Sequence, residues 1–370
     1  MIKLIKSMLA SFVRKFRRKE ELRSLRRNIK EMDGIAQEIC YKFQGKGYLI
    51  PKLNHDELSA VRDFWSKYSK IPPDDSFYRL AKFAFGFSKE FVPESMLYTL
   101  IQWNLNDAKE ARIFEDKGLY GFYFSDLKRP REVVKCYRGI FFSESNKCIS
   151  EADAIQAVIS YGEPFIIKPS RFSEQGRNVQ RIDSYDHSDL PALFDKYGKD
   201  FVVQGVIQQC GELAALNRTS VNCIRITSLL LNGKYSCLSS TIKVGGRGLA
   251  IDNVGAGGFL VGVHSDGRLY SKGFDAKGNV VESTYDGVPL KSIVVPSFDR
   301  VLDFASILHT RVPQLPFLGI DIAVDIDGEP VFVEMNAYSP GVVYEQMCTG
   351  PIFADRLQEV LEYINKGKRK

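Results

Sequence analysis

The chain has 370 residues, of which 44% are apolar, so it can bury one or two cores and is not an intrinsically disordered protein. Its formal net charge is +6, but residues 1–30 hold eleven Lys and Arg against only Glu20 and Glu21, a local charge of +9. The remaining residues therefore sum to −3, and the body of the chain lacks the basic surface of a nucleic-acid-binding protein.

The cysteines and the apolar segments bear on the cellular compartment in which the protein is expected. Seven cysteines are scattered without a CxxC pair, which is typical of a reducing environment. No uninterrupted run of about 18 apolar residues occurs, so no transmembrane helix is expected. The first apolar segment is broken by Lys6 and followed by basic residues rather than a signal-peptide cleavage site. We therefore expect a cytoplasmic protein.

The first residues predict a basic amphipathic helix. Apolar side chains recur at helical spacing, with Lys and Arg between them; they are Ile2, Ile5, Leu9, Phe12 and Phe16. Two interpretations stay open. The helix packs on its own domain or on a partner, or it lies on an anionic membrane surface and brings the protein to the inner face of the membrane.

The pattern stays helical from Glu20 to about Tyr68, breaks at the Pro/Asp cluster of residues 71–75, and is helical again to about Asn106. Beyond Arg112, short aromatic and β-branched runs typical of strands appear, at residues 118–124 and 132–142 among others. We expect a helical region over 1–106, a first α/β lobe over 107–200 and a second lobe over 201–370. Helices are expected at 151–160, 298–311 and 352–365.

Hairpin signals determine the expected fold class. Asn232-Gly233 and Asp327-Gly328 each lie between two apolar runs, and such pairs favour tight turns between antiparallel strands. A purely parallel sheet is therefore disfavoured, and an α+β fold with mixed or antiparallel sheets is predicted. The strand candidates are Phe165–Lys168, Phe201–Val206, Val221–Leu231, Tyr235–Lys243, Gly258–Val263, Phe317–Val324 and Pro330–Glu334.

Residues 163–180 carry the first candidate site. An apolar strand delivers Lys168 at its end, Pro169 stops it, and a polar loop with Ser170 and Arg171 follows. A lysine so placed can bind a phosphate, and the loop and Arg171 can close over it. The segment lacks the GxxxxGK[ST] pattern of a Walker loop, and a structural lysine is the plain alternative.

Residues 201–213 form a second candidate. An apolar strand runs into a short connector and then Glu212. Such a connector can offer main-chain donors and acceptors to an adenine edge, and the carboxylate can reach ribose hydroxyls. Taken alone, this segment has no specific signature.

Residues 319–341 are the most informative segment. Asp327-Gly328 forms a hairpin turn, so Asp321 lies on the first strand, and Glu334 and Asn336 point to one face at the end of the second. Two carboxylates and an amide suit Mg²⁺ bridging to phosphates. The alternative is a surface hairpin with solvated acids. However, Glu334 follows the apolar residues 331–333, and burying it without a partner would be costly.

Two arginines lie near the expected site. Arg225 is flanked by apolar residues, so an inward guanidinium needs an anionic partner, and a structural ion pair is the alternative. Arg247 belongs to the glycine-rich segment GGRGLAIDNVGAGG, in which Asp252 and Asn253 are further candidates for substrate contact. A mere flexible connection is the other interpretation of this segment.

The order of these motifs resembles the ATP-grasp superfamily. IIKPSR is similar to the phosphate-lysine strand and lid of D-alanine–D-alanine ligase-like enzymes, and Asp321, Glu334 and Asn336 match the Asp-x12-Glu-x-Asn metal pattern. The amino-acid sequence of residues 216–230 and 243–263 is similar to that of the sugar-transfer-associated ATP-grasp branch. The likeness covers about residues 107–365 and implies two α+β lobes that clamp Mg-ATP.

The resemblance also implies a role for individual residues. Lys117 and Lys168 would be the phosphate lysines, Lys243 a γ-phosphate ligand, Gln204, Gly205 and Val206 the adenine hinge, and Glu212 the ribose ligand. Ser170 and Arg171 would belong to the lid. One position departs from the pattern: Gly319 stands where D-alanine ligase-like enzymes have an arginine that steadies the oxyanion. Because Arg225 and Arg247 lie in a strand and a glycine-rich loop that face the expected site, we expect one of them to take this role.

The implied function is an ADP-forming carboxylate–amine ligase that uses Mg²⁺ and ATP and makes an amide through an acyl phosphate. Its substrates would be a sugar carboxylate and an amine in cell-surface polysaccharide synthesis. Three alternatives stay open: a ligase that joins amino acids, a non-catalytic ATP-binding adaptor of a polysaccharide assembly, and a phosphotransferase to a hydroxyl.

Overall fold

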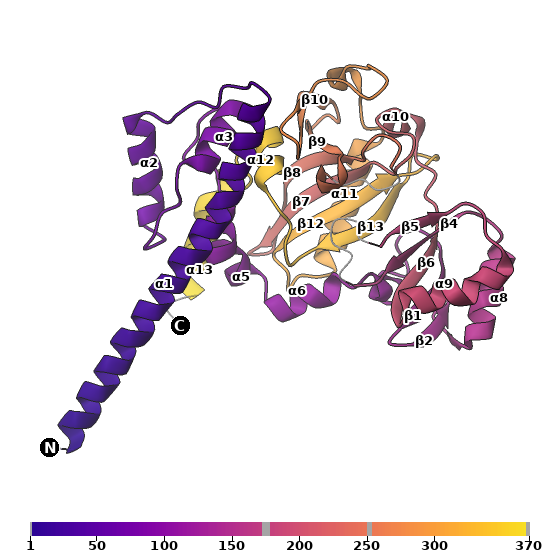
Figure 1. Ribbon diagram of the computed structural model, residues 1–370, viewed down its shortest axis with the longest axis horizontal. Helices are drawn as coiled ribbons and strands as arrows, with labels where there is room; N and C mark the ends of the chain where they lie inside the picture. Colours follow the sequence, from indigo (N-terminus) through magenta and orange to yellow (C-terminus); the bar gives the residue numbers. More distant parts are fainter. Residues whose placement is uncertain (1, 172–177, 250–253, 368–370) are drawn as a thin grey trace. The chain divides into compact units, whose positions relative to one another are not determined.

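The computed structural model describes residues 2–171, 178–249 and 254–367. It has two compact units (Figure 1). The first combines Met1–Asn104 with Gly350–Lys370, and the second is Leu105–Thr349. The predicted division of the chain into three parts, with boundaries after residues 106 and 200, remains a proposal. The compact units differ from them, because residues 350–370 group with the N-terminal helices and the rest of the body forms one unit.

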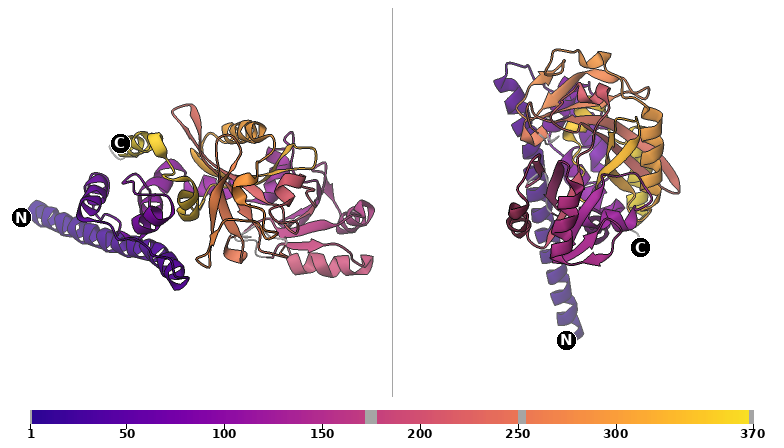
Figure 2. Two further views of the ribbon diagram at one scale, coloured as in Figure 1. Left: turned by 90° about the horizontal axis from the view of Figure 1, so that it is seen from above. Right: turned by 90° about the vertical axis from the view of Figure 1, so that its right-hand side faces the viewer.

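The first unit is helical. Its main helices are α1 (Ile2–Gly45), α2 (His55–Ser66), α3 (Ser76–Ala84) and α13 (Leu357–Gly367), with the short α4 (Glu94–Met96), a π-helical turn η1 (Leu97–Ile101), α5 (Gln102–Leu105) and η7 (Ala354–Arg356). Both views in Figure 2 show α1 as one continuous helix. The core is fixed by a hydrogen bond of 2.5 Å from Trp65 Nε1 to the buried Tyr78 hydroxyl.

The helical pattern predicted from residue 20 to 68 is interrupted in the structure. Gly47 adopts a φ of 88°, a conformation that a side chain rarely tolerates, and α1 has ended at Gly45. Helix α2 then begins after Asn54, whose side chain accepts from the Glu57 amide while Glu57 caps the Asn54 amide in return. The break therefore has a local cause that hydrophobic periodicity does not register.

A seven-stranded sheet dominates the second unit. Its strand order is β11-β10-β9-β8-β7-β12-β13. The strands are β7 (Cys223–Leu231), β8 (Lys234–Val244), β9 (Phe259–Val263), β10 (Leu269–Asp275), β11 (Val280–Val281), β12 (Phe317–Val324) and β13 (Pro330–Asn336). Helix α11 (Phe298–Thr310) packs on one face, where Ile224, Ile320 and Ile322 belong to a continuous core with Val301 and Leu308.

The second sheet of this unit has six strands in the order β3-β2-β1-β6-β4-β5. They are β1 (Glu132–Tyr137), β2 (Ile140–Ser143), β3 (Cys148–Ile149), β4 (Phe165–Pro169), β5 (Gln180–Ile182) and β6 (Asp200–Gly205). Helices α8 (Glu151–Tyr161) and α9 (Leu190–Tyr197) bury one face, and Phe165, Ile167 and Phe201 fill that core. The other face is free of these helices.

The remaining short elements of the second unit are α6 (Ala108–Phe114), η2 (Lys117–Leu119), α7 (Tyr120–Tyr123), η4 (His187–Asp189), α10 (Gly211–Ala214), η5 (Val254–Ala256), η6 (Leu290–Ser292) and α12 (Val343–Thr349). Every strand pairing within the described ranges is antiparallel. The predicted α+β class is therefore confirmed. Both predicted turns are present, with Gly233 and Gly328 at φ of 74° and 75°.

The strand prediction for residues 118–124 is wrong. Their aromatic run predicted a strand, but they form η2 and α7. The Tyr120 hydroxyl donates to the Phe114 carbonyl at 2.9 Å and accepts from the Met335 amide at 3.0 Å, and its ring packs 4.8 Å from that of Phe332. Tertiary packing of the aromatic rings therefore overrides their local strand preference.

The seven cysteines are free. Within the described ranges, no helix combines the length and the apolar character that crossing a membrane requires.

Candidate functional site

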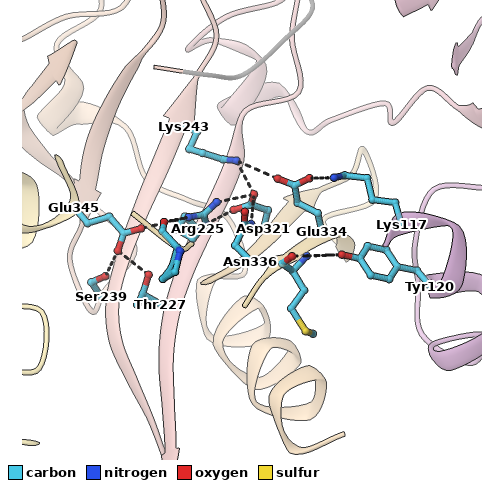
Figure 3. A network of polar contacts seen from close by, with 12 residues as sticks. Lys117, Tyr120, Arg225, Thr227, Ser239, Lys243, Asp321, Glu334, Asn336 and Glu345 are labelled. Carbon is cyan, nitrogen blue, oxygen red and sulfur yellow. Dashed lines mark hydrogen bonds and ion pairs between the residues drawn. The ribbon is translucent and has the colours of Figure 1, made fainter. Parts of the chain in front are cut away.

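The candidate site lies on the face of the seven-stranded sheet opposite α11. Glu334, Asp321, Arg225 and Thr241 are register partners across β13, β12, β7 and β8, so their side chains share this face. The neighbouring row is Asn336, Gly319, Thr227 and Ser239. Figure 3 shows the resulting network of polar side chains.

Asp321 is the centre of this network and is 0% exposed. Arg225 forks onto it, with Nε 2.5 Å from Oδ1 and Nη2 3.0 Å from Oδ2. The Lys243 ammonium lies 2.6 Å from Oδ2, and the Asn336 amide donates to the same oxygen at 3.3 Å. The buried carboxylate is thus compensated by two cations, as its burial requires.

Glu334 lies between two lysines. Its Oε2 is 3.0 Å from the Lys117 ammonium and its Oε1 is 4.0 Å from that of Lys243. Burial alone would raise the pKa of Glu334, but the Lys117 and Lys243 ammonium groups hold this pKa well below its ordinary value. Glu334 is therefore ionised at neutral pH.

Six of the predicted site residues, Lys117, Arg225, Lys243, Asp321, Glu334 and Asn336, thus meet in one place. Along the network, the charges alternate in sign from Arg225 through Asp321, Lys243 and Glu334 to Lys117 (Figure 3). A network of this kind holds long side chains in fixed positions.

Lys117 is presented by a turn that the Lys168 strand supports. The Lys117 amide donates to the Ser170 carbonyl at 2.8 Å, and the Asp116 side chain accepts from the Gly118 amide at 3.0 Å. Arg171 clamps this turn, with Nε 3.0 Å from Asp116 and Nη2 2.7 Å from Asp200. In the structure, Arg171 therefore braces the lysine turn, and its lid role remains a proposal.

Replacing Arg171 by glutamine should lower stability, because Asp116 is buried and would lose its cation. Since Arg171 itself is 29% exposed, we expect a loss of about 2 kcal/mol in the free energy of unfolding, below the range for a fully buried pair. Urea denaturation measures it. The control is Arg181→Gln, which breaks an exposed pair with Asp183 in the same sheet and should cost less than about 0.5 kcal/mol. Equal effects of the two changes would contradict the bracing role.

Lys168 and Gln204 lie on the face of the six-stranded sheet that α8 and α9 leave free, since Lys168 pairs with Val202 and Gln204 with Ile166. Within the described part of the chain, the Lys168 ammonium makes no hydrogen bond or ion pair. Burial, followed by the nearby charge of Lys117, lowers the pKa of Lys168 to about 8. A buried lysine in this state favours an anionic ligand.

The other predicted nucleotide residues are placed as follows. Gly205 ends β6, and its amide donates to the Arg131 carbonyl at 2.8 Å, so this amide already has a partner. Val206 follows in the connector and is half-buried, while Glu212 lies exposed in α10. Ser170 is buried beside the Lys117 turn.

Of the two candidate arginines, only Arg225 joins the network. Arg247 is exposed in the glycine-rich segment, which Asn217 supports by donating to the Gly245 carbonyl at 3.0 Å and to the Gly246 carbonyl at 3.1 Å. Asp252 and Asn253 lie outside the described residues, as do residues 172–177 of the predicted lid.

Several members of the network were not foreseen from the sequence. Glu345 on α12 accepts from Thr227 and Ser239, and Tyr120 holds the end of β13. Thr227 and Ser239 stand next to Ser228 and Ser240 on their strands, so the sequence shows no regular alternation there that would indicate a polar face. Glu345 carries no sequence signal, because helix α12 reaches the sheet only through the tertiary fold.

Asp321, Glu334 and Asn336 offer oxygen donors of the kind that a divalent cation binds. Among residues 2–171, 178–249 and 254–367, no three His, Cys, Asp or Glu side chains cluster as metal ligands would, since the candidate set pairs two carboxylates with the amide of Asn336. The Lys243 ammonium, however, lies between the Asp321 and Glu334 carboxylates and acts as a stand-in cation. The set therefore fits Mg²⁺, which accepts oxygen ligands of this kind.

Comparison with known proteins identifies the family. A family model described as sugar-transfer associated ATP-grasp matches residues 99–362, more than half of the chain. The chain belongs to this family. All residues of the network lie within the matched range of this ATP-grasp protein. The resemblance inferred from the motifs is confirmed at the level of the family. Among curated proteins, no match was found.

Similar solved structures include D-alanine–D-alanine ligase from Bacillus anthracis (15% identity, TM-score 0.38, covering 70% of this chain and 69% of that one). VanG D-Ala:D-Ser ligase from Enterococcus faecalis has 12% identity and a TM-score of 0.38, and the match covers 71% of this chain and 61% of that one. The ATP-grasp ligase PsnB complexed with a minimal precursor has 14% identity and a TM-score of 0.38, and the match covers 69% of this chain and 63% of that one. The chain thus spans less than two thirds of the last two proteins.

Proposed function

We propose that this ATP-grasp protein is an ADP-forming ligase that joins a carboxylate to an amine through an acyl phosphate. The observation that carries the proposal is the convergence of Lys117, Lys168 and Lys243 with Asp321 and Glu334. Phosphoryl transfer from ATP requires fixed cations beside the phosphates, together with carboxylates that can hold a divalent cation.

In this proposal, the lysines bind and orient the triphosphate. Lys168 offers a buried ammonium, and the turn clamped by Arg171 fixes Lys117 beside it. Asp321, Glu334 and Asn336 would hold Mg²⁺, and a bound Mg²⁺ would neutralise phosphate charge. Lys243, whose ammonium binds Asp321 in this structure, would then move towards the phosphates, because their oxygens can replace the carboxylate as its partner.

The reaction has two steps. A substrate carboxylate oxygen forms a bond to the γ-phosphorus while the bond to the bridging oxygen breaks, and ADP leaves. The amine nitrogen then bonds to the acyl carbon, phosphate leaves, and the amine loses a proton. The cations of the network stabilise the charge on the transferring group, and no covalent enzyme intermediate is needed.

We propose a sugar carboxylate as the acceptor and a place in cell-surface polysaccharide synthesis. The support is the description of the matched family as sugar-transfer associated. The amine would be an amino acid or an amino alcohol.

The test supplies Mg-ATP with pooled sugar carboxylates and pooled amines, and it measures ADP, AMP and product mass. Release of ADP and phosphate only when both pools are present supports the ligase and identifies its substrates. AMP would mean adenylation and contradict the acyl phosphate. ATP binding without turnover favours the adaptor, a product from two amino acids favours the peptide ligase, and a phosphorylated hydroxyl favours the phosphotransferase.

The affinity for ATP should depend on pH through Lys168. Its pKa of about 8 means that the amine is charged below this pH and becomes neutral as the pH rises through it. Loss of this cation should weaken ATP binding by about tenfold, as the loss of one charged hydrogen bond does. Equilibrium ATP binding measured from about pH 6.5 to 9.5 tests this, and Lys168→Met should flatten the curve. A flat curve for the wild type would contradict it.

We also propose that residues 1–30 contact an anionic membrane surface at the inner face of the membrane, which is compatible with a cytoplasmic location. The supporting observations are the local charge of +9 and the unbroken helix from Ile2. Sedimentation with anionic and neutral vesicles tests it, and replacement of Arg14, Lys15, Arg17 and Arg18 by glutamine should reduce binding. Equal binding to neutral vesicles would exclude it.

A further inference from the structure

Glu345 is a buried carboxylate to which the proposed chemistry gives no role. It is 3% exposed on α12. Its Oε2 accepts from Thr227 Oγ1 at 2.7 Å and from Ser239 Oγ at 3.2 Å, and its Oε1 lies 3.6 Å from Arg225 Nη1. Burial raises the pKa of Glu345, and the Arg225 guanidinium opposes this shift. These three partners fix the carboxylate in one place.

Arg225 connects Glu345 to the metal side of the network. One edge of its guanidinium, Nε and Nη2, binds both oxygens of Asp321, while Nη1 faces Glu345 and donates to the Pro340 carbonyl at 3.0 Å. Because the guanidinium is planar, movement of its Nη1 end turns the edge that orients Asp321. Figure 3 shows Glu345 and Asp321 on opposite sides of Arg225.

Gly319 provides the space in which Arg225 lies. A Cβ atom at this position would be 3.1 Å from Arg225 Cδ and 3.2 Å from its Nη1, closer than most carbon contacts. A side chain at residue 319 would therefore require Arg225 to shift by a few tenths of an ångström. The glycine and the arginine form a matched pair from neighbouring strands.

We propose that Glu345 is a positioning residue: it holds Arg225 so that Asp321 keeps the orientation in which it binds a divalent cation together with Glu334 and Asn336. Glu345 itself does not touch the cation or the nucleotide. The inference rests on the proposed function only in taking these three side chains as the cation site. It assigns Glu345, Thr227, Ser239 and Gly319 to support of that site.

The test measures the affinity for Mn²⁺ in the presence of ADP, corrected for binding of Mn²⁺ to ADP alone. Glu345→Gln preserves the size of the side chain and removes its charge. We expect its Mn²⁺ dissociation constant to rise roughly ten- to hundredfold, the usual effect of losing a residue that orients a metal ligand. The affinity for ADP without metal should stay unchanged, which a general loss of structure would not allow. Thr227→Val should shift Mn²⁺ affinity in the same direction by less.

The matched control is Glu329→Gln, which removes a carboxylate paired with Arg300 at the surface of the same sheet and should leave Mn²⁺ affinity unchanged. A folded Glu345→Gln protein with unchanged Mn²⁺ affinity would overturn the proposal. If that variant does not fold, unchanged affinity in Thr227→Val overturns it instead. Absence of Mn²⁺ binding to the wild type would also overturn it. Mn²⁺ binding without ligation in the wild type would count only against the proposed ligase function.

Discussion

Replacing Glu334 by glutamine should reduce ADP-forming turnover by about 10³-fold, comparable to removing a preorganised group that stabilises the transition state. The side chain lies between the Lys117 and Lys243 ammonium groups and is ionised at neutral pH. The amide removes the charge that pairs with both lysines and that would hold a divalent cation. Steady-state ADP release at saturating Mg-ATP measures the effect.

The control for this change is Glu329→Gln, on the same hairpin but at the surface, which should leave turnover within about twofold of the wild type. The melting temperature of Glu334→Gln should fall by a few degrees, because Lys117 and Lys243 are only 13% and 15% exposed and lose their shared counter-charge, so turnover is compared well below the unfolding transition of both proteins. Full turnover in Glu334→Gln would remove this carboxylate from the proposed site.

Replacing Lys243 by methionine should have two opposite effects. The nucleotide-free protein should bind Mn²⁺ about tenfold more tightly, because a cation 2.6 Å from Asp321 no longer competes for the carboxylates. Turnover should fall about 10²-fold, because the same ammonium is proposed to stabilise the transferring phosphate. Electron paramagnetic resonance of free Mn²⁺ and ADP release measure the two effects separately.

Lys168→Met is the matched control, since Lys168 is a lysine of the same site without an ion pair to either carboxylate. It should weaken ATP binding and leave Mn²⁺ affinity of the free protein nearly unchanged. If Lys243→Met binds Mn²⁺ no more tightly than the wild type, Lys243 does not occupy the place of a cation. Its proximity to Asp321 would then be a structural ion pair.

Much of the scaffold could be predicted from the sequence, because the signals were local. Asn232-Gly233 and Asp327-Gly328 produce turns with left-handed glycines, and turn geometry fixes the pairing of the flanking strands. The turn register alone would oppose Asp321 to Val333 and leave Glu334 on the other face; a β-bulge between Asp321 and Ile322 shifts the pairing, so that Asp321 pairs with Glu334 on the face that Asn336 shares. The motif order also indicated the ATP-grasp family, which the family model confirms.

The sequence-based predictions failed where contacts between residues far apart in the sequence determine the local structure. The run 118–124 became helical because Tyr120 packs against Phe332 and bonds to the end of β13, more than 200 residues away in sequence. No periodicity within the run contains this information. The lysine turn that precedes it owes its position to Arg171 and Asp200 in the same way.

The sequence by itself determined the α+β class, the main strands with their turns and the ATP-grasp family, and it indicated the residues that are proposed to bind phosphate and metal. Only the tertiary structure decided how these charges are paired. It selected Arg225 rather than Arg247 as the partner of Asp321, and it brought Glu345 to the network from α12. The physical reason is burial: a charged side chain removed from water must meet its counter-charges in space, and these come from segments whose spacing along the chain carries no signal.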